Sequence, residues 1–171
     1  MKKFIYAVIS LLFVASLAIA GGYQYKSNKD HLGGDLTPAE AYKMVKKDPD
    51  HTFLVDCRTR AEYQFVGHAE NSYNIPLRFL TTNVGKKGYT ETMNESFGKD
   101  LLSRFDPKTD TLIILCRSGN RSCTACNEAI KAGFGDTKVF NMMGGFEGGK
   151  NKNKASIYHG KRWAGGWKLE G

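Results

Sequence analysis

The sequence has little of what common metal sites and disulfide frameworks require. Its 171 residues include four cysteines and four histidines, and their spacing is neither that of a disulfide framework nor that of a zinc site. We therefore expect no metal and no cofactor. No basic stripe is interleaved with stacking aromatic residues, so nucleic acid is not an expected partner. No internal repeat is visible, and the length suits one domain with a substantial core.

One long hydrophobic run is present, at residues 4–20, after a short basic start at residues 2–3. Together with a small-x-small cleavage signal at residues 18–20, this is the layout of a secretory signal peptide. Residues 1–20 are therefore predicted to direct export, to the periplasm or otherwise out of the cytoplasm. The alternative is an uncleaved membrane anchor formed by residues 4–20, although this run is short for a membrane-spanning helix.

Basic residues outnumber acidic ones. The 25 Lys and Arg residues and 17 Asp and Glu residues give a net charge of +8. Removal of residues 1–20 takes away Lys2 and Lys3 and leaves a net charge of +6. This excess is explained either by a soluble basic surface or by a cationic site entrance that attracts small anions.

Composition divides the rest of the chain into three parts. Residues 21–34 form a polar leader, residues 35–149 hold the regular elements of a folded domain, and residues 150–171 form a basic tail rich in Lys, Gly and Asn. Trp163 and Trp167 are expected to dock this tail on the domain, because aromatic side chains usually serve packing. A binding role for the tail is the alternative.

Strands alternate with helices along the domain. Thr37, Pro38 and Glu40 are the N-cap, first-turn proline and capping-box glutamate of a helix, and Gly133 stands where a helix C-cap is expected. The predicted helices are residues 38–47, 59–63 and 122–132, and the predicted strands are residues 51–55, 72–75, 111–115 and 139–142. This alternation predicts an α/β fold with a parallel central sheet flanked by helices on both sides. The ligand site of such a sheet lies outside the carboxyl ends of its strands.

Residues 77–105 are the least regular part of the domain. Gly85 to Gly88 is predicted to form a turn, and residues 94–105 form an amphipathic segment. The apolar face of that segment consists of Phe97, Leu101, Leu102 and Phe105. We expect residues 77–105 to cover one side of the sheet. The alternative is that they shape the entrance to the site.

The loop of residues 116–121 is the most informative part of the sequence. It follows the β-branched strand of residues 111–115 and precedes the predicted helix start at Ser122. In this arrangement main-chain N–H groups surround the sulfur of Cys116, and the helix N-terminus and nearby arginines favour its thiolate. Cys116 is therefore the predicted nucleophile. The predicted substrate-binding residues are Arg117, Ser118, Gly119, Asn120, Arg121 and Ser122.

Motif spacing narrows the chemistry. Four residues separate Cys116 from Arg121. The loop is therefore shorter than the loop of phosphatases that form a phosphocysteine. It resembles the active-site loop of the rhodanese family of single-cysteine sulfurtransferases. A second motif of that family resembles residues 56–76, which contain in order the patterns Asp-x-Arg, Glu-Tyr, Gly-His and Asn-Ile-Pro. Residues 141–148 resemble its last strand and Gly-Gly turn. The resemblance covers about residues 35–149.

The resemblance implies a two-step transfer of sulfane sulfur. Cys116 takes the outer sulfur of a small anionic donor, such as thiosulfate or polysulfide, and becomes a persulfide. An acceptor, which is a thiol, cyanide or a protein, then removes that sulfur. The loop amides would stabilise the charge of the persulfide. An alternative function is that of a persulfide carrier, a binding protein that turns over little on its own. A third possible function is that of a phosphatase or an arsenate reductase that uses the same cysteine.

Charged residues outside the loop are expected to support it. Asp56 and Arg58 follow a buried strand, where an isolated charge is costly, so a hydrogen-bonded pair is predicted there. Arg121 can tie the loop to Glu62 or Asp56, or it can hold the donor. The structural role is favoured for Arg121, and Arg117 is expected to face the substrate.

The remaining cysteines are interpreted mainly as packing residues. Cys123 and Cys126 share a helix face and can pack as small apolar groups, pair with each other, or resolve the Cys116 persulfide as a disulfide, and packing is favoured. The family commonly has small residues at these two positions, so the sequence leaves their redox state open. Cys57 is interpreted as a core residue at the end of a strand.

Overall fold

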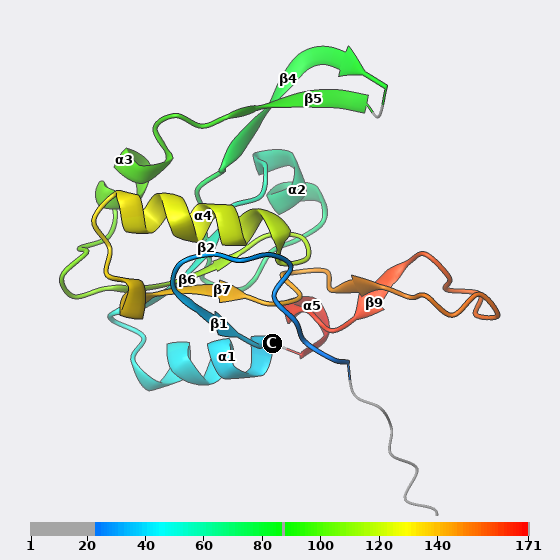
Figure 1. Cartoon of the computed structure of the whole chain (residues 1–171), viewed down its shortest axis with the longest axis horizontal. Helices are drawn as coiled ribbons and strands as arrows, with labels where there is room; N and C mark the ends of the chain where they lie inside the picture. The colour runs from blue at the N-terminus through cyan, green and yellow to red at the C-terminus, as the bar shows by residue number, and fades with distance from the viewer. Residues whose placement is uncertain (1–22, 87, 171) are drawn as a thin grey trace, which may run out of the picture.

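Five parallel strands form the central sheet in the order β1-β7-β6-β2-β3 (Figure 1). The computed structural model describes residues 23–86 and 88–170, so the predicted signal peptide lies outside the described residues. The strands are β1 (Gly34–Leu36), β2 (Thr52–Asp56), β3 (Tyr73–Asn74), β6 (Thr111–Leu115) and β7 (Val139–Met142). The predicted parallel sheet is confirmed, and β6 lies at its centre.

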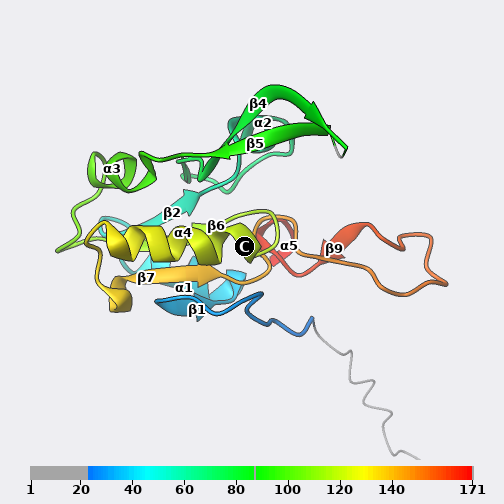
Figure 2. The same ribbon diagram turned by 45° about the horizontal axis from the view of Figure 1, so that its top comes forward.

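Helices cover both faces of this sheet, as predicted (Figures 1 and 2). The helices are α1 (Pro38–Lys47), α2 (Arg60–Phe65), α3 (Phe97–Leu102), α4 (Asn120–Lys131), α5 (Trp167–Glu170) and a 3-10 turn (Asp136–Lys138). α3 and α4 lie on one face, and α1 and α5 lie on the other. Side chains of β6 alternate between the two cores, with Leu112 and Ile114 on the α4 side and Ile113 and Leu115 on the α1 side.

Side-chain caps fix the starts of α1 and α2. Thr37 and Glu40 form the predicted capping box at the start of α1, and Thr59 and Glu62 form another at the start of α2. Each box satisfies main-chain N–H groups that have no partner within the helix. The second box also fixes the position of Glu62, which becomes important at the site.

The start of α4 differs from the prediction. The helix begins at Asn120 rather than at Ser122, because Gly119 takes the left-handed conformation, with φ +92°, and turns the chain into the helix there. Asn120 and Arg121 therefore belong to the first helical turn. At the other end Gly133, with φ +114°, terminates the helix as predicted.

Residues 77–105 contain a hairpin that the sequence did not predict. Strands β4 (Arg78–Gly85) and β5 (Gly88–Met93) pair antiparallel and project from the body of the molecule (Figure 1). Gly85 pairs with Gly88 across the predicted turn. Most side chains of the hairpin are exposed, so the expectation that this stretch covers the sheet is wrong for the hairpin.

The part of this stretch after the hairpin does cover the sheet. Phe97, Leu101 and Phe105 are buried in the core on the α4 side, as the amphipathic pattern predicted. Leu102 is the exception, because its side chain is 43% exposed. α3 ends at this residue, and the predicted apolar face is therefore narrower than expected.

The segments before and after the domain core pack against it. The leader runs beside α4, where the Leu32 N–H donates to Asn127 Oδ1 at 2.7 Å. In the tail, β8 (Gly149–Lys150) pairs antiparallel with β9 (Arg162–Ala164). Trp167 packs on the core beside α1, whereas Trp163 is half exposed and stacks on Tyr158. Within the described residues, no helix is both long and apolar enough to cross a membrane.

Candidate active site

Cys116 lies directly after β6, where the chain turns into α4. Its Sγ accepts a hydrogen bond from the main-chain N–H of Gly119 at 3.2 Å and lies 3.5 Å from the Ser122 hydroxyl. The N-terminus of α4 adds partial positive charge beside the sulfur. Donors therefore converge on the Cys116 sulfur, an arrangement that favours its ionised form.

The environment of Cys116 lowers the pKa of its thiol although the residue is only 1% exposed. Burial opposes ionisation, but hydrogen bonds from the Cys57 thiol and from the hydroxyl and main-chain N–H of Ser122 outweigh it. Together they hold the pKa of Cys116 well below its ordinary value. A lowered pKa increases the thiolate fraction of Cys116, and a thiolate is both a nucleophile and a good leaving group.

A cavity of about 310 Å³ opens above Cys116. Its lining residues are Glu62, Glu91, Cys116, Arg117, Ser118, Asn120 and Arg121. Four of the six predicted substrate-binding residues are among them, while Gly119 and Ser122 contact the sulfur instead. Besides Cys116, the described lining carries two guanidinium groups and two carboxylates, so its arginines are matched in number by acidic residues. It is not the cationic entrance that the net charge suggested.

Arg121 is held mainly by Glu62. Its Nη1 and Nη2 donate to the two carboxylate oxygens of Glu62 at 2.8 and 2.6 Å. Burial alone would lower the pKa of Arg121, but this pairing raises it above the ordinary range. Arg121 thus ties the start of α4 to α2. Arg117 is exposed, and none of the ion pairs within residues 23–86 and 88–170 includes it.

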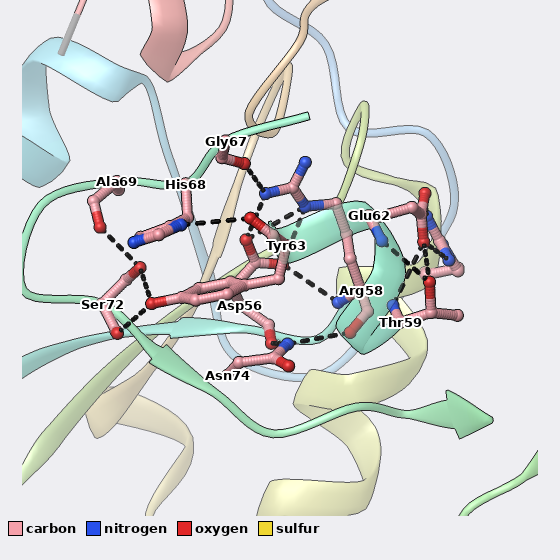
Figure 3. Close-up of polar contacts among 11 residues, drawn as sticks. Asp56, Arg58, Thr59, Glu62, Tyr63, Gly67, His68, Ala69, Ser72 and Asn74 are labelled. Atoms are coloured by element: carbon pink, nitrogen blue, oxygen red, sulfur yellow. Dashed lines mark hydrogen bonds and ion pairs between the residues drawn. The ribbon is translucent and has the colours of Figure 1, made fainter. Parts of the chain in front are cut away.

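Asp56 and Arg58 form a fully buried pair at the end of β2 (Figure 3). Arg58 Nη2 donates to Asp56 at 2.6 Å and to the Gly67 carbonyl at 2.7 Å. The guanidinium lies 4.5 Å from the centroid of the Phe146 ring, and the Phe146 N–H donates to the Cys116 carbonyl at 2.7 Å. The predicted pair therefore reaches the loop of residues 116–121 through Phe146 rather than by direct contact.

The motif residues after Arg58 form a hydrogen-bonded turn, which Figure 3 shows. The Tyr63 hydroxyl donates to the Ser72 carbonyl at 2.7 Å, and the ring of His68 stacks on that of Tyr63 with centroids 3.8 Å apart. Asn74 Nδ2 donates to the carbonyls of residues 56 and 58 at 3.0 and 2.9 Å. These side chains fix the chain that leads from β2 to β3, and none of them lines the cavity.

The Gly-Gly turn after β7 lies against the main chain of the loop of residues 116–121. Gly145 has φ +58°, and a Cβ on it would lie 2.3 Å from the Cys116 carbonyl oxygen. The next residues bond to the loop: the Phe146 N–H donates to Cys116 O, and the Glu147 N–H donates to Arg117 O at 2.9 Å. Close approach of the two chains therefore requires glycine at 145.

Sequence reasoning missed two residues at the site, Asn28 and Glu91. Asn28 Nδ2, from the leader, donates to the Ser118 carbonyl at 2.6 Å. Glu91, from β5, lines the cavity and lies 3.6 Å from Arg121. The one signal that pointed to Glu91 was the alternative interpretation that residues 77–105 shape the site entrance.

Cys57, Cys123 and Cys126 are buried free thiols, like Cys116. Cys123 Sγ donates to the Gly119 carbonyl at 3.0 Å, and Cys126 lies in the core on the α4 side. Burial raises the pKa of each of these two thiols. Across the part of the chain that the structure describes, no group of three or more His, Cys, Asp or Glu side chains is arranged to hold a metal ion.

The family model of the Rhodanese-like domain matches residues 37–152 of the sequence. This match includes both motifs that surround the site, the buried Asp56–Arg58 pair and the loop after Cys116. The Gly-Gly turn at residues 144–145 also lies within it.

Individual relatives match most of the same region. An uncharacterized protein of Rickettsia rickettsii is 33% identical over 130 residues, which cover 75% of this chain and 95% of the relative. Thiosulfate sulfurtransferase 16, a chloroplastic protein of Arabidopsis thaliana, is 34% identical over 96 residues, covering 56% of this chain and 71% of that protein. The crystal structure of Rv0390 from M. tuberculosis matches with a TM-score of 0.64 at 32% identity, covering 82% of this chain and 95% of that one.

Proposed function

This chain belongs to the rhodanese-like family, and on that premise we propose that it is a sulfurtransferase that works through a persulfide on Cys116. The observation that carries the proposal is the environment of the Cys116 sulfur. The sulfur accepts a hydrogen bond from the Gly119 N–H at 3.2 Å and lies beneath a cavity of about 310 Å³. The name of the Arabidopsis thaliana relative, thiosulfate sulfurtransferase 16, supports the reaction class.

In the proposed first step the Cys116 thiolate attacks the outer sulfur of thiosulfate or of a polysulfide. With thiosulfate, the bond between the two donor sulfurs breaks, and sulfite leaves with the electron pair. The outer sulfur stays on Cys116 with its negative charge. Loop N–H groups and the N-terminus of α4 stabilise that charge as an oxyanion hole stabilises oxygen.

In the second step a thiolate or cyanide attacks the outer sulfur, and the Cys116 thiolate leaves. The low pKa of Cys116 makes it a good leaving group, since a thiol of lower pKa leaves faster. The nucleophile is already an anion in both steps, first the Cys116 thiolate and then the acceptor thiolate or cyanide, so no general base is required. The described residues that line the cavity accordingly work by binding and charge.

The proposal is tested by mixing the protein with thiosulfate and cyanide and measuring thiocyanate. Wild type should form thiocyanate with multiple turnovers, and Cys116→Ser should abolish it. Cys126→Ala is the matched control, because Cys126 is buried in the core and does not line the cavity; this variant should keep the activity. Equal rates for Cys116→Ser and wild type would exclude Cys116 as the transferring residue.

One observation favours the second candidate, a persulfide carrier that serves a protein partner. The hairpin beside the cavity exposes Leu80, Val84 and Tyr89, and exposed apolar groups near a site can contact a protein. Intact-mass spectrometry after thiosulfate treatment should show an adduct of about 32 Da in either case. A stable adduct with negligible turnover on cyanide and small thiols would favour the carrier.

We further propose that this chemistry takes place outside the cytoplasm, since residues 1–20 have the layout of an export signal. The mass of the protein isolated from the producing cells tests this. Loss of residues 1–20 supports cleavage and export, and a full-length chain in the membrane fraction supports the anchor. A full-length chain in the cytosol contradicts both.

A further inference from the structure

The β4–β5 hairpin brings a carboxylate to the cavity above Cys116. Glu91 lies on β5 opposite Leu80 of β4 and lines the cavity. Its Oε1 lies 3.6 Å from Nη1 of Arg121, and its Oε2 lies 3.8 Å from Nη1 of Arg78. Two arginines therefore hold this carboxylate at the site, although it comes from an otherwise exposed hairpin.

Arg121 does not need Glu91 as its structural partner. The bidentate pair with Glu62, at 2.8 and 2.6 Å, already fixes the guanidinium. The Glu91 side chain is 30% exposed and lies farther away, at 3.6 Å. Arg78, the other partner of Glu91, does not line the cavity. Among the described lining residues, the two carboxylates around Arg121 leave an excess of one negative charge, and Arg117 is the remaining arginine. Glu91 thus cancels charge that would otherwise attract an anion.

We propose that Glu91 makes the site select sulfur donors by charge, favouring donors with one negative charge over the dianion thiosulfate. This inference rests on the proposed sulfur transfer at Cys116 and names its substrate class, which is sulfane donors with one negative charge. The Coulomb repulsion between a donor and Glu91 is proportional to the donor's charge. Across a partly screened entrance, each unit of donor charge is expected to change kcat/KM about threefold.

A matched pair of donors isolates this effect. Methanethiosulfonate carries one negative charge and thiosulfate carries two, and both present a sulfane sulfur to the Cys116 thiolate. In each reaction the sulfur–sulfur bond of the donor breaks and a new bond to Cys116 forms. Methanesulfinate or sulfite leaves with the electron pair, and the transferred sulfur keeps one negative charge. The two reactions therefore differ mainly in the charge of the donor and of its leaving group.

The experiment compares kcat/KM for both donors, with cyanide as acceptor, in wild type and Glu91→Gln. We expect an increase of about ninefold for thiosulfate and about threefold for methanethiosulfonate in the variant. The preference for the monoanion should then fall about threefold in the variant. This difference in donor preference between wild type and variant should shrink at high salt. Glu95→Gln is the matched control, because Glu95 is exposed and does not line the cavity; its donor preference should equal that of wild type.

The readout separates a charge effect from a structural one. If Glu91 only stabilised the hairpin through Arg78, its replacement would change both donors by the same factor, and an unchanged ratio would overturn the inference. An equal shift of the ratio in Glu95→Gln would also overturn it. Failure of wild type to use either donor would overturn the proposed function itself. Activity with an unchanged ratio would overturn only the role of Glu91.

Discussion

Cys57 and Cys116 lie side by side just beyond the carboxyl ends of β2 and β6. The parallel register ends with Asp56 opposite Leu115, and the Cys57 N–H donates to the Leu115 carbonyl at 2.9 Å, so the next residue of each strand continues the pairing. Burial, together with a hydrogen bond to Cys116, raises the pKa of Cys57 well above its ordinary value. Cys57 therefore stays protonated and donates to the neighbouring thiolate.

Replacement of Cys57 by Ala should make Cys116 harder to ionise. Loss of the thiol donor removes a hydrogen bond to a charged sulfur, so the pKa of Cys116 should rise. At mildly acidic pH, alkylation of Cys116 by iodoacetamide should slow roughly three- to tenfold, the effect of about 1 kcal/mol. Peptide mass spectrometry over a pH series measures it. Cys126→Ala removes a thiol from the same core and should leave the pH dependence of Cys116 alkylation unchanged. The same pH dependence in wild type and both variants would contradict the role of Cys57.

The Glu62–Arg121 pair should give the protein a pH-dependent stability. Burial favours the protonated acid, but the hydrogen bonds from Arg121 outweigh it and lower the pKa of Glu62 below its ordinary value. The pair therefore stabilises the fold above the ordinary carboxyl pKa of about 4.3, and this stabilisation is lost as pH falls through the lowered value.

Glu62→Gln tests this dependence, because Gln keeps an oxygen for the capping box with Thr59. The variant should lose about 1–2 kcal/mol of unfolding free energy at pH 7, and the difference from wild type should disappear in acid below the lowered pKa. Urea denaturation at several pH values measures it. The exposed Glu70, changed to Gln, provides the control. A difference that stays constant with pH would show that the ion pair is not its cause.

Gly145→Ala should displace the active loop. A Cβ at this position would lie 2.3 Å from the Cys116 carbonyl oxygen, so the main chain of the loop must move. We expect the rate of sulfur transfer to fall more than about tenfold, because a displacement of reacting groups by about 1 Å can lower a rate by more than that. Gly160→Ala is the control, because Gly160 also has positive φ, +80°, but faces open space. It should cost about 1 kcal/mol of stability and keep full activity; equal losses in both variants would point to backbone strain instead.

The elements that the sequence predicted are those whose signals are local. The capping box of Thr37 and Glu40 marks the start of α1 within four residues, and the run of apolar residues at 111–115 indicates the central strand. The position of Cys116 then follows, because a ligand site in a parallel sheet lies beyond the strands' carboxyl ends. The fold and the position of the loop that begins at Cys116 were predictable for this reason.

What the sequence did not predict depends on contacts between distant segments. β1 has only three residues and exists as a strand through its pairing with β7. The β4–β5 hairpin is exposed on both faces, so it lacks the alternation of apolar and polar residues that identifies strands. Glu91 and Asn28 reach the site from this hairpin and from the leader, and no local pattern encodes those contacts.

The buried Asp56–Arg58 pair should contribute strongly to the stability of the fold although it does not touch the sulfur. Both side chains are 0% exposed, so Arg58→Met leaves an uncompensated carboxylate in the core, and the unfolding free energy should fall by about 3–5 kcal/mol. Asp56→Asn in the same chain removes that charge and should recover a large part of the loss, because the two effects are coupled. Urea denaturation of the single and double variants measures this coupling. If the double variant instead lost the sum of the two single losses, the carboxylate would not be the cause, and the contact of Arg58 with Phe146, at 4.5 Å, would account for the stability.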